Sequence, residues 1–370
     1  MAILFIAISN IGSLRRILRH PQTSDSPRVS VLVPARNEEA NIGSCVRSIL
    51  EQEYPNFELI VIDDDSSDRT LKLLEELRTE DQRMRVMKSQ PLPQEWVGKN
   101  WACHQLAQAA DGELLLFTDA DTRHHPEALG DAVATLLADE LDVVTALPKQ
   151  EIVSLGEMLV IPFMSWSIIS FLPLRLAYKS RPAALSATIG QYMLFRRQAY
   201  EDIGGHESVR QHALDDLMLG RRIKAHRLRW RLLDGSGRIN CRMYQNFHQI
   251  WEGVSKNLFA VFEYNVAVFL FIWIWLSIVF FEPIVVLILG LAIFSVSTLS
   301  IILAAIAVAI SLISWGITHF RFGFPLYLMF LYPITMLLAL AIATRSILIS
   351  FAGRATWKER TLNKPAIRWW

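Results

Sequence analysis

Short apolar runs alternate with helical patterns through the first part of the chain. The runs are rich in branched residues and are predicted to be buried strands; they cover residues 29–35, 57–64, 84–89, 113–121 and 141–148. The helical patterns between them cover residues 41–52, 68–78, 101–110 and 126–137. Strand and helix in alternation predict an α/β fold with a mainly parallel sheet and helices on both faces.

The middle of the chain has a mixed pattern. Residues 152–182 are apolar but are broken by Pro162 and Pro173, and basic residues stand at the trailing end. Two interpretations stay open: helices that lie on a membrane surface, or an ordinary buried helical layer. From 186 to 240 the pattern is again that of a globular protein, and 228–234 is a further strand-like run.

Residues 266–350 form the most apolar part of the chain. Their only charged side chains are those of Glu282, Arg321 and Arg345. A membrane-spanning helix needs ~20 to 25 apolar residues, so this segment is long enough for roughly three spans. The sequence therefore predicts an α-helical transmembrane domain at 266–350, followed by a basic tail at 351–370.

The N-terminal residues 1–20 contain an apolar run that is shorter than a full span. We expect a short membrane anchor here, either on the membrane surface or as a short span. Arginines follow the run, and such residues gather on the cytoplasmic side of membranes; they are Arg15, Arg16, Arg19 and Arg28. The prediction is an integral protein of the cell membrane whose globular domain lies in the cytoplasm.

The same rule creates a conflict at the other end of the chain. Three complete crossings from a cytoplasmic domain would place the basic tail outside. An even number of crossings, with one segment at the interface, would remove the conflict. The Glu282–Pro283 pair interrupts the first apolar run and is the expected mark of that segment.

Composition adds two limits. The formal net charge is only +1, so we expect no nucleic-acid partner. Of the residues, 52% are hydrophobic, which fits a membrane protein. The cysteines Cys45, Cys103 and Cys241 are widely spaced. They show no metal-binding or disulfide spacing, and we expect them to be small buried hydrophobic residues.

Carboxylates stand at the carboxyl ends of two of the predicted strands. Residues 63–65 are three aspartates, and Asp119 and Asp121 flank one alanine. In sheets of this kind, ligands bind beyond the carboxyl ends of the strands, so both groups are expected to border one crevice. Close carboxylates repel unless a cation lies between them. Either Asp119 and Asp121 share Mg²⁺ or Mn²⁺ with a diphosphate, or they belong to a solvated acidic loop.

Four ordered segments carry a family resemblance. They are "VSVLVPARNEE" (29–39), "VIDDDSSDRT" (61–70), "GKNWACHQLAQAADGELLLFTDAD" (98–121) and "IGQYMLFRRQAYEDIGGHESVRQHALDDLMLGRRIK" (189–224). Together they resemble the family 2 glycosyltransferases of the GT-A fold over roughly residues 29–260. The resemblance implies a Rossmann-like nucleotide-sugar-binding domain at 29–260. It also implies a hexosyltransferase of EC class 2.4, with UDP-hexose as the expected donor.

The resemblance also implies roles for individual residues. Asp119 and Asp121 correspond to the family's metal-binding D-x-D motif, with Mg²⁺ or Mn²⁺ as cofactor. Asp216, with Asp215 beside it, stands where the family carries the catalytic base of a single inverting displacement. The expected nucleotide-sugar-binding residues are Pro34, Asn37, Glu38, Asp63, Asp64, Lys99, Asp119 and Lys256. For Asn37 and Glu38, simple turn formation is an equal alternative, and His206 is either an acceptor contact or a structural histidine.

Further segments narrow the resemblance. The stretches "GKNWAC", "GGH", "SKNLFA" and "WKER" are similar to enzymes that glycosylate membrane lipids such as carotenoids, hopanoids or glycerolipids. The implied partners are a nucleotide sugar, a lipid acceptor and the bilayer. The chain lacks the Q-x-x-R-W signature of polysaccharide synthases, which argues against polymer synthesis.

Other functions remain as alternatives. A polyprenyl-phosphate sugar transferase would use a phosphate acceptor, and a membrane scaffold would have lost the chemistry. The stretch "DADT" at 119–122 also fits the nucleophile motif of haloacid dehalogenase-like phosphatases. That motif is expected on an early strand, whereas this one follows the fourth.

Overall fold

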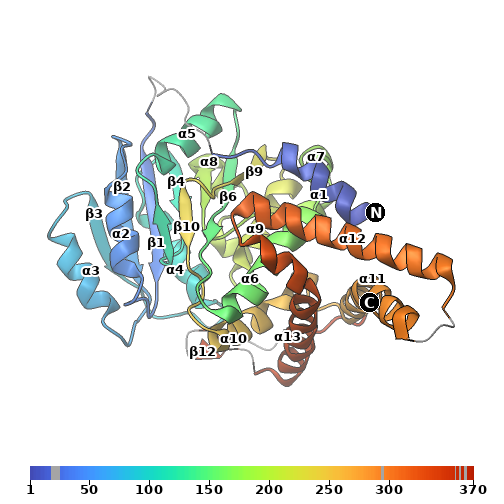
Figure 1. Cartoon of the computed structure of the whole chain (residues 1–370). Coiled ribbons are helices and arrows are strands. Elements are labelled where there is room, and N and C mark those ends of the chain that lie inside the picture. Colours follow the sequence, from blue (N-terminus) through green and yellow to red (C-terminus); the bar gives the residue numbers. More distant parts are fainter. Residues whose placement is uncertain (18–25, 293–295, 355, 358–359, 362–364) are drawn as a thin grey trace. The chain divides into compact units, whose positions relative to one another are not determined.

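The computed structural model describes most of the chain (Figure 1). The described residues are 1–17, 26–292, 296–354, 356–357, 360–361 and 365–370. Arg19 of the predicted arginine cluster, and Lys358 and Lys364 of the basic tail, lie outside them. The chain forms two compact units. We call Ser13–Glu151 with Leu174–Met243 the sheet unit, and Met1–Gly12, Ile152–Pro173 and Tyr244–Trp370 the helical unit.

The sheet unit is built on a seven-stranded sheet with the order β3-β2-β1-β4-β8-β6-β9. The strands are β1 Val29–Ala35, β2 Phe57–Asp63, β3 Met84–Lys88, β4 Leu114–Phe117, β6 Val143–Leu147, β8 Met193–Arg196 and β9 Trp230–Asp234. Only β8 runs antiparallel to its neighbours, so the expected mainly parallel sheet is confirmed. Sequence reasoning missed β8, because its short apolar run "MLF" is bounded by no turn signal.

A small second sheet lies after β4. It has the order β5-β10-β7, with β5 Thr122–His124, β7 Lys149–Gln150 and β10 Ile239–Cys241. These strands have at most three residues, which is too short for a periodic pattern to reveal them. β5 of the second sheet begins at Thr122, directly after Asp121, and therefore holds the backbone that follows the Asp119–Asp121 pair.

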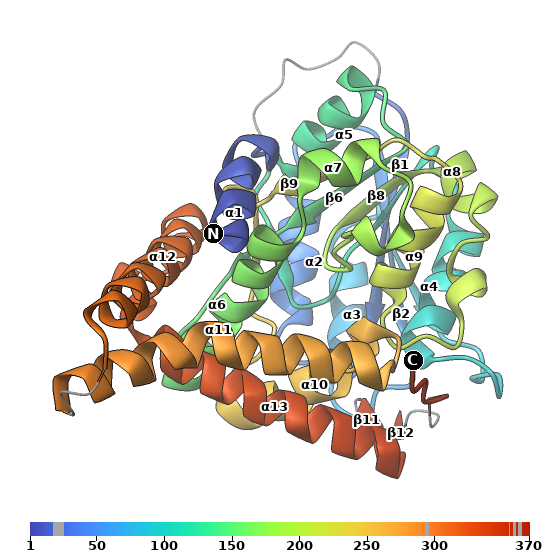
Figure 2. The same ribbon diagram turned by 90° about the vertical axis from the view of Figure 1, so that its right-hand side faces the viewer.

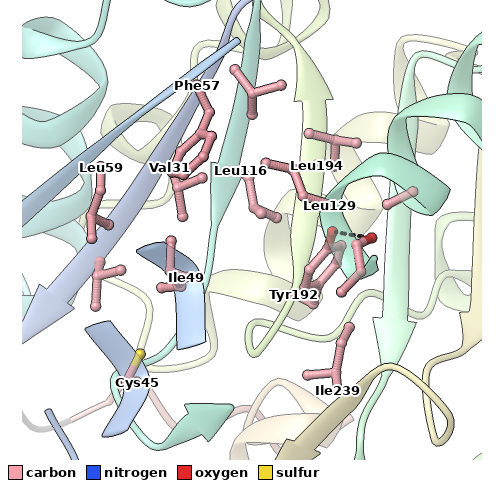
Figure 3. Close-up of a cluster of buried hydrophobic side chains, with 14 of the residues drawn as sticks. Val31, Cys45, Ile49, Phe57, Leu59, Leu116, Leu129, Tyr192, Leu194 and Ile239 are labelled. Carbon is pink, nitrogen blue, oxygen red and sulfur yellow. Dashed lines mark hydrogen bonds between the residues drawn. The ribbon is translucent and has the colours of Figure 1, made fainter. Parts of the chain in front are cut away.

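Helices cover both faces of the large sheet. The helices α2 Ile42–Leu50, α3 Thr70–Arg78 and α5 Ala128–Ala138 share one buried cluster with alternate residues of the strands. Figure 3 shows Val31, Leu59 and Leu116 of three strands beside Ile49 of α2. Burying a side chain of this size stabilises the fold by about 2 kcal/mol. The helix α4, Gly98–Ala109, contacts β1 and β2, and Figure 2 places it on the opposite side of the strands from α2.

The order of the strands creates a crevice. From β1 the chain moves outward through β2 and β3, and it then returns to place β4 on the other side of β1. Such a reversal separates the connecting loops of two neighbouring parallel strands and is where ligands bind. Ala35 pairs with Asp63, and Leu32 pairs with Phe117, so the carboxyl ends of β1, β2 and β4 meet at one edge.

The helical unit contains long apolar helices, shorter apolar helices and an amphipathic helix. The long ones are α11 Val266–Ala292, α12 Thr298–Phe322 and α13 Tyr332–Ala352, the shorter ones are α1 Ala2–Ser13 and α6 Leu155–Phe171, and the amphipathic helix is α10 Phe247–Leu258. Three segments, namely Val266–Gly290, Thr298–Phe322 and Leu326–Ala352, are long and apolar enough to cross a membrane. This agrees with the three spans expected from the sequence.

One expectation for these helices is wrong. The Glu282–Pro283 pair does not break the first apolar segment, because α11 continues through Pro283. A proline removes one backbone hydrogen bond from a helix, and long apolar helices tolerate that loss where neighbouring structure compensates.

The predicted segment 152–182 forms α6 and, in the sheet unit, the short helix α7 Leu174–Lys179. A capping box of Ser154 and Glu157 begins α6. Within the helical unit, Trp166 of α6 stacks on Trp315 of α12 at 4.8 Å between ring centroids. This packing is what a buried helical layer requires, and a location at the membrane surface stays a prediction.

The helices α11 and α13 run antiparallel. The ring centroid of Phe280, in the middle of α11, lies 6.0 Å from that of Tyr332 at the start of α13. At the other end, the Val266 N–H donates to the Arg368 carbonyl, and the Phe351 and Trp369 rings are 5.8 Å apart. The end of α13 and the last residues of the chain therefore lie beside the start of α11.

Candidate active site

A lysine and two aspartates from separate parts of the sheet unit form the centre of the site. Lys99 lies in the first turn of α4, and its Nζ is 2.8 Å from Asp119 Oδ1 and 3.8 Å from Asp215 Oδ2. Burial opposes the charge on Lys99, but the two carboxylates hold the pKa of Lys99 well above its usual value. The structure thus joins three of the predicted site residues around one cation.

The helix α4 begins three residues earlier than the sequence predicted. The Val97 N–H, just before the helix, donates to the Arg210 carbonyl, and the Asn100 side chain donates to the Val209 carbonyl at 2.8 Å. These bonds tie the first turn to the 206–210 segment. Gly98 and Lys99 are therefore helical, and Lys99 is held in a defined position.

Asp121 is the most strongly perturbed carboxyl at the end of β4. Burial, followed by the charges of Asp119 and Glu38, raises the pKa of Asp121 to about 7. Its Oδ1 is buried and has no hydrogen-bond partner among the described residues. A buried oxygen without a partner is costly, so a cation at this position would relieve both the repulsion and the lost hydration.

The residues present fit a divalent metal that is shared with a ligand. Among the residues that the structure describes, no group of three or more His, Cys, Asp or Glu side chains could hold a metal by itself. Two carboxylates leave most positions of an oxygen-coordinated ion open. Asp119 and Asp121 could therefore hold Mg²⁺ or Mn²⁺ only if phosphate or water oxygens supplied the remaining ligands.

Asp215 and Asp216 begin the helix α9, Asp215–Ala225, where the helix dipole favours acids. The Oδ2 of Asp216 accepts a bond from the Gly190 N–H at 3.0 Å, and its Oδ1 accepts one from the Leu217 N–H at 2.7 Å. Burial and the neighbouring Asp215 raise the pKa of Asp216 to about 6. Burial acts on Asp215 too, but Lys99 and His206 hold the pKa of Asp215 well below its usual range.

The pKa values of the two carboxyls shift in opposite directions. The lowered pKa of Asp215 suits a counter-ion of Lys99, 3.8 Å away. A carboxyl whose pKa is raised to about 6 has the property that a general base needs. The role of Asp216 as the catalytic base stays a prediction.

His206 has a structural position. It is 2% exposed, its Nδ1 lies 2.8 Å from the Tyr200 hydroxyl, and its backbone N–H donates to the same hydroxyl at 3.0 Å. Burial lowers the pKa of His206, which favours the neutral ring. Its Nε2 is 3.7 Å from Asp215 Oδ2. Of the two open readings, the structure favours the structural histidine.

Gly190 is a site residue that the sequence reasoning missed. A Cβ atom at this position would lie 3.3 Å from Lys99 Nζ and 3.4 Å from Asp216 Oδ2. Glycine therefore leaves room between the cation and the base, and its N–H orients the base. The only signal in the sequence is a glycine three residues before β8, which does not reveal what lies opposite.

Asn37 and Glu38 connect the turns that follow β1 and β2. The Asn37 N–H donates to Ser66 Oγ at 3.1 Å, and Asn37 Oδ1 accepts a bond from the Ser67 N–H at 2.9 Å. The Glu38 N–H donates to Thr70 Oγ1 at 2.8 Å. These bonds support the turn-forming role of both residues, and contact with a nucleotide stays a prediction.

Asp63 and Asp64 are buried at the end of β2, with 4% and 3% exposure. The Oδ2 of Asp63 accepts a bond from the Ser66 N–H at 3.3 Å, and its Oδ1 is buried with no hydrogen-bond partner among the described residues. Asp63 thus keeps an acceptor for a ligand. Pro34 lies in β1 opposite Ile62.

Lys256 lies on α10 of the helical unit. Its predicted contact with the donor stays a prediction.

These features define a class of protein. A mainly parallel sheet places paired carboxylates, a lysine and a carboxyl with a pKa near 6 around the crevice where its strand order reverses. This is the architecture of the GT-A fold. Residues 30–204 match the family model "Glycosyl transferase family 2". This stretch of the chain is therefore similar to family 2 glycosyltransferases, and Asp215 and Asp216 lie 11 and 12 residues after its end.

Two curated relatives are similar to the chain. A 4,4'-diaponeurosporenoate glycosyltransferase of Staphylococcus haemolyticus is 26% identical over 65% of this chain and 63% of its own length. A beta-monoglucosyldiacylglycerol synthase of Trichormus variabilis is 31% identical over 48% of this chain and 38% of its own length. The matched part of the chain thus spans less than two thirds of either relative.

A solved structure supports the fold. A mannosyltransferase from Pyrobaculum calidifontis, in complex with GDP-Man and Mn²⁺, is 17% identical and matches with a TM-score of 0.52 over 94% of each chain. At this level of identity the likeness concerns the fold alone.

Gly205→Ala is expected to destabilise the protein. Gly205 has a φ of +47°, and a Cβ there would lie 2.6 Å from the Tyr200 ring. A side chain in this conformation costs about 2 kcal/mol or more, and the clash would displace the Tyr200–His206 pair. We expect the thermal midpoint of the purified protein to fall by about 5 °C or more.

Gly237→Ala is the matched control for this experiment. A Cβ at Gly237 meets no atom within 4 Å. Its thermal midpoint should stay close to that of the wild type. Equal midpoints for the two variants would contradict the tight packing described at Gly205.

Proposed function

We propose that this chain is a membrane-bound glycosyltransferase that moves a sugar from a nucleotide sugar to a lipid. The observation that carries the proposal is the cluster of Lys99, Asp119, Asp215 and Asp216 at the carboxyl edge of the sheet. Lys99 and Asp119 lie within the stretch that matches the family 2 glycosyltransferase model, and Asp215 and Asp216 lie 11 and 12 residues beyond it. The names of both curated relatives specify lipid-like acceptors, a carotenoid acid and a diacylglycerol. They support an acceptor with an apolar body and one reactive hydroxyl or carboxyl group.

The donor side of the reaction involves stabilising the leaving nucleoside diphosphate. Asp119 and Asp121 are the residues that would hold Mg²⁺ or Mn²⁺, and such an ion, when bound, offsets charge on the diphosphate. Lys99 supplies a fixed positive charge beside Asp119. A preorganised cation in a partly buried site stabilises developing negative charge more than solvent does. Asp63 has a buried carboxylate oxygen without a partner among the described residues, and this oxygen would accept a hydrogen bond from an N–H or O–H group of the nucleotide.

The acceptor side requires removal of a proton. The carboxylate of Asp216 takes the proton from the acceptor hydroxyl as the new bond to the sugar forms and the bond to the diphosphate breaks. One displacement of this kind inverts the configuration at the sugar carbon and needs no covalent intermediate on the protein. A carboxylic-acid acceptor is already ionised at neutral pH and would need no base.

The test is turnover by the purified full chain in detergent. A panel of UDP- and GDP-sugars would be supplied with total membrane lipid, with and without Mg²⁺ or Mn²⁺. We expect metal-dependent release of nucleoside diphosphate that rises with added lipid and forms a glycosylated lipid. Donor binding without turnover on any lipid fraction would contradict the proposal and favour a scaffold.

We also infer how the chain crosses the membrane. The last residues lie beside the start of α11, because Arg368 and Trp369 accept backbone bonds from Val266 and Ala267. Only an even number of complete crossings between these points brings them to the same side. The basic tail and the start of α11 would then share the cytoplasmic side, as expected from the positive-inside rule.

Cysteine labelling tests this topology. Ala366→Cys and Glu80→Cys each place a reactive thiol at an exposed position, whereas the native cysteines are buried. A membrane-impermeant maleimide should label neither variant in intact cells and both in inverted vesicles. Labelling of the two variants from opposite sides would show an odd number of crossings and refute the inference.

A further inference from the structure

A second polar pocket lies at the edge of the sheet formed by β9. It has a volume of about 240 Å³ and is lined by residues that include Asp139, Tyr178, Arg227, Arg229, Trp230 and Arg231. β9 is the last strand of the sheet, and β6 and β8 separate it from β4. The pocket is therefore distinct from the carboxylate cluster, and none of the roles described above uses it.

The acidic groups around this pocket already have basic partners. Arg229 Nη1 is 2.8 Å from Glu140 Oε2, and its other guanidinium nitrogen donates to the Asp139 carbonyl at 2.8 Å. The Asp139 carboxylate lies 3.0 Å from Arg15 Nη2. The carboxylates at the rim are thus neutralised by Arg15 and Arg229.

Two arginines of the pocket keep unused donors. Within the part of the chain that the structure describes, neither Arg227 nor Arg231 makes an ion pair. The Arg231 guanidinium stacks over Tyr178, 4.8 Å from the ring centroid, and its Nε is buried without a hydrogen-bond partner among the residues that the structure describes. A buried donor without an acceptor is unfavourable, so the pocket is electrostatically and geometrically prepared for an anion.

The geometry favours a phosphate. A guanidinium offers paired donors that match two phosphate oxygens, and its plane is kept in place here by stacking on an aromatic ring. Trp230 and Tyr178 meet edge to face, with centroids 5.1 Å apart. Aromatic rings with a polar end beside arginines are typical of sites at a membrane interface.

Chain connections link this pocket to the apolar helices. Tyr178 lies on α7, which begins directly after Pro173, the end of the α6 segment. Arg15 lies two residues after Ser13, which is the last residue of α1 and the first residue of the sheet unit. Within the helical unit, the Asn10 side chain donates to the Ile169 and Leu172 carbonyls, which holds the ends of α1 and α6 together. Along the chain, Arg15 and Tyr178 thus each follow closely after a helix of the helical unit.

We propose that the pocket of Arg227, Arg231 and Tyr178 binds the phosphate group of an anionic phospholipid. The inference rests on the proposed membrane location, but not on the sugar-transfer chemistry. Basic residues near an anionic membrane surface are attracted to it. A lipid held here would orient the sheet unit on the bilayer from which it takes its acceptor.

Binding of short-chain lipids to the purified full chain tests the proposal. Calorimetric titrations would compare dihexanoyl-phosphatidylglycerol with dihexanoyl-phosphatidylcholine, glycerol phosphate and inorganic phosphate. We expect the phosphatidylglycerol to bind at least tenfold more tightly than the others. The double variant Arg227→Gln/Arg231→Gln should lose that preference while keeping its thermal midpoint.

The control double variant is Lys72→Gln/Arg78→Gln. It removes the same charge from the exposed face of α3, where both side chains pair with glutamates of their own helix. It should retain the preference. Equal loss of the preference for phosphatidylglycerol in both double variants would show that only net charge matters. Tight binding of inorganic phosphate would show that the ligand is a soluble anion and not a lipid. Either result overturns the proposal. The titration contains no nucleotide sugar, so it tests lipid binding even if the chain has no transferase activity.

Discussion

Asp216→Asn is expected to lower the rate of sugar transfer to a lipid hydroxyl by at least about 100-fold, because an amide cannot accept the acceptor's proton. The wild-type rate should also depend on pH. The base acts when ionised, and the pKa of Asp216 is raised to about 6 by burial and by Asp215. The rate should therefore fall as the pH drops through about 6 and level off above it. Initial rates of the wild type and of Asp216→Asn from pH 5 to 8 would give the fold-change in rate and the apparent pKa.

A matched control separates this effect from a general loss of negative charge. Asp202→Asn removes an exposed carboxylate at the end of α8, Arg197–Asp202, and should leave the rate and its pH profile unchanged. Full activity of Asp216→Asn towards a hydroxyl acceptor would disprove the role of Asp216 as base. Retained activity with a carboxylic-acid or phosphate acceptor, and loss with a hydroxyl, would instead identify the acceptor group.

Removal of the divalent metal is expected to have the second large effect. A chelator should lower transfer by at least about 100-fold, because a metal at a transferring group supplies several kcal/mol of charge stabilisation. Mn²⁺ or Mg²⁺ should restore the rate. Asp121→Asn should show the same low rate without a chelator and should not be rescued by either ion.

Donor binding gives this prediction a readout other than activity. The wild type should bind nucleotide sugar more tightly with metal present, whereas Asp121→Asn should bind it equally with and without metal. Asp111→Asn, which alters an exposed carboxylate before β4, serves as the control. Transfer that is insensitive to chelation in the wild type would show that Lys99 and the protein alone stabilise the leaving group.

The regular part of the sheet unit was predictable from the sequence. The strands β1, β2 and β3 and the helices α2 and α3 lie within one or two residues of their predicted bounds, because each has a long enough apolar pattern. β8 was not predictable from so short a run. Its position between β4 and β6 is decided by packing, since it runs antiparallel to both.

The site was predictable in part. Asp119 and Asp121 follow a strand, and Asp215 and Asp216 begin a helix, so motifs in the sequence indicate them. Nothing in the sequence indicates that Gly190 lies between Lys99 and Asp216, because these residues meet through long-range contacts. The pocket beside β9 was missed for the same reason, since Arg15, Tyr178 and Arg231 come from three distant segments.

The sequence by itself determined the fold class, the ends of the strands at which carboxylates stand, and the presence of helices long enough for a membrane. Those properties depend on local periodicity and apolar length, which neighbouring residues set. The tertiary structure decided which carboxylates share Lys99, why Asp216 differs in pKa from Asp215, and that the end of α13 returns to the start of α11. Those properties depend on burial and on the distance between charges, and only packing between segments far apart in the chain sets either one.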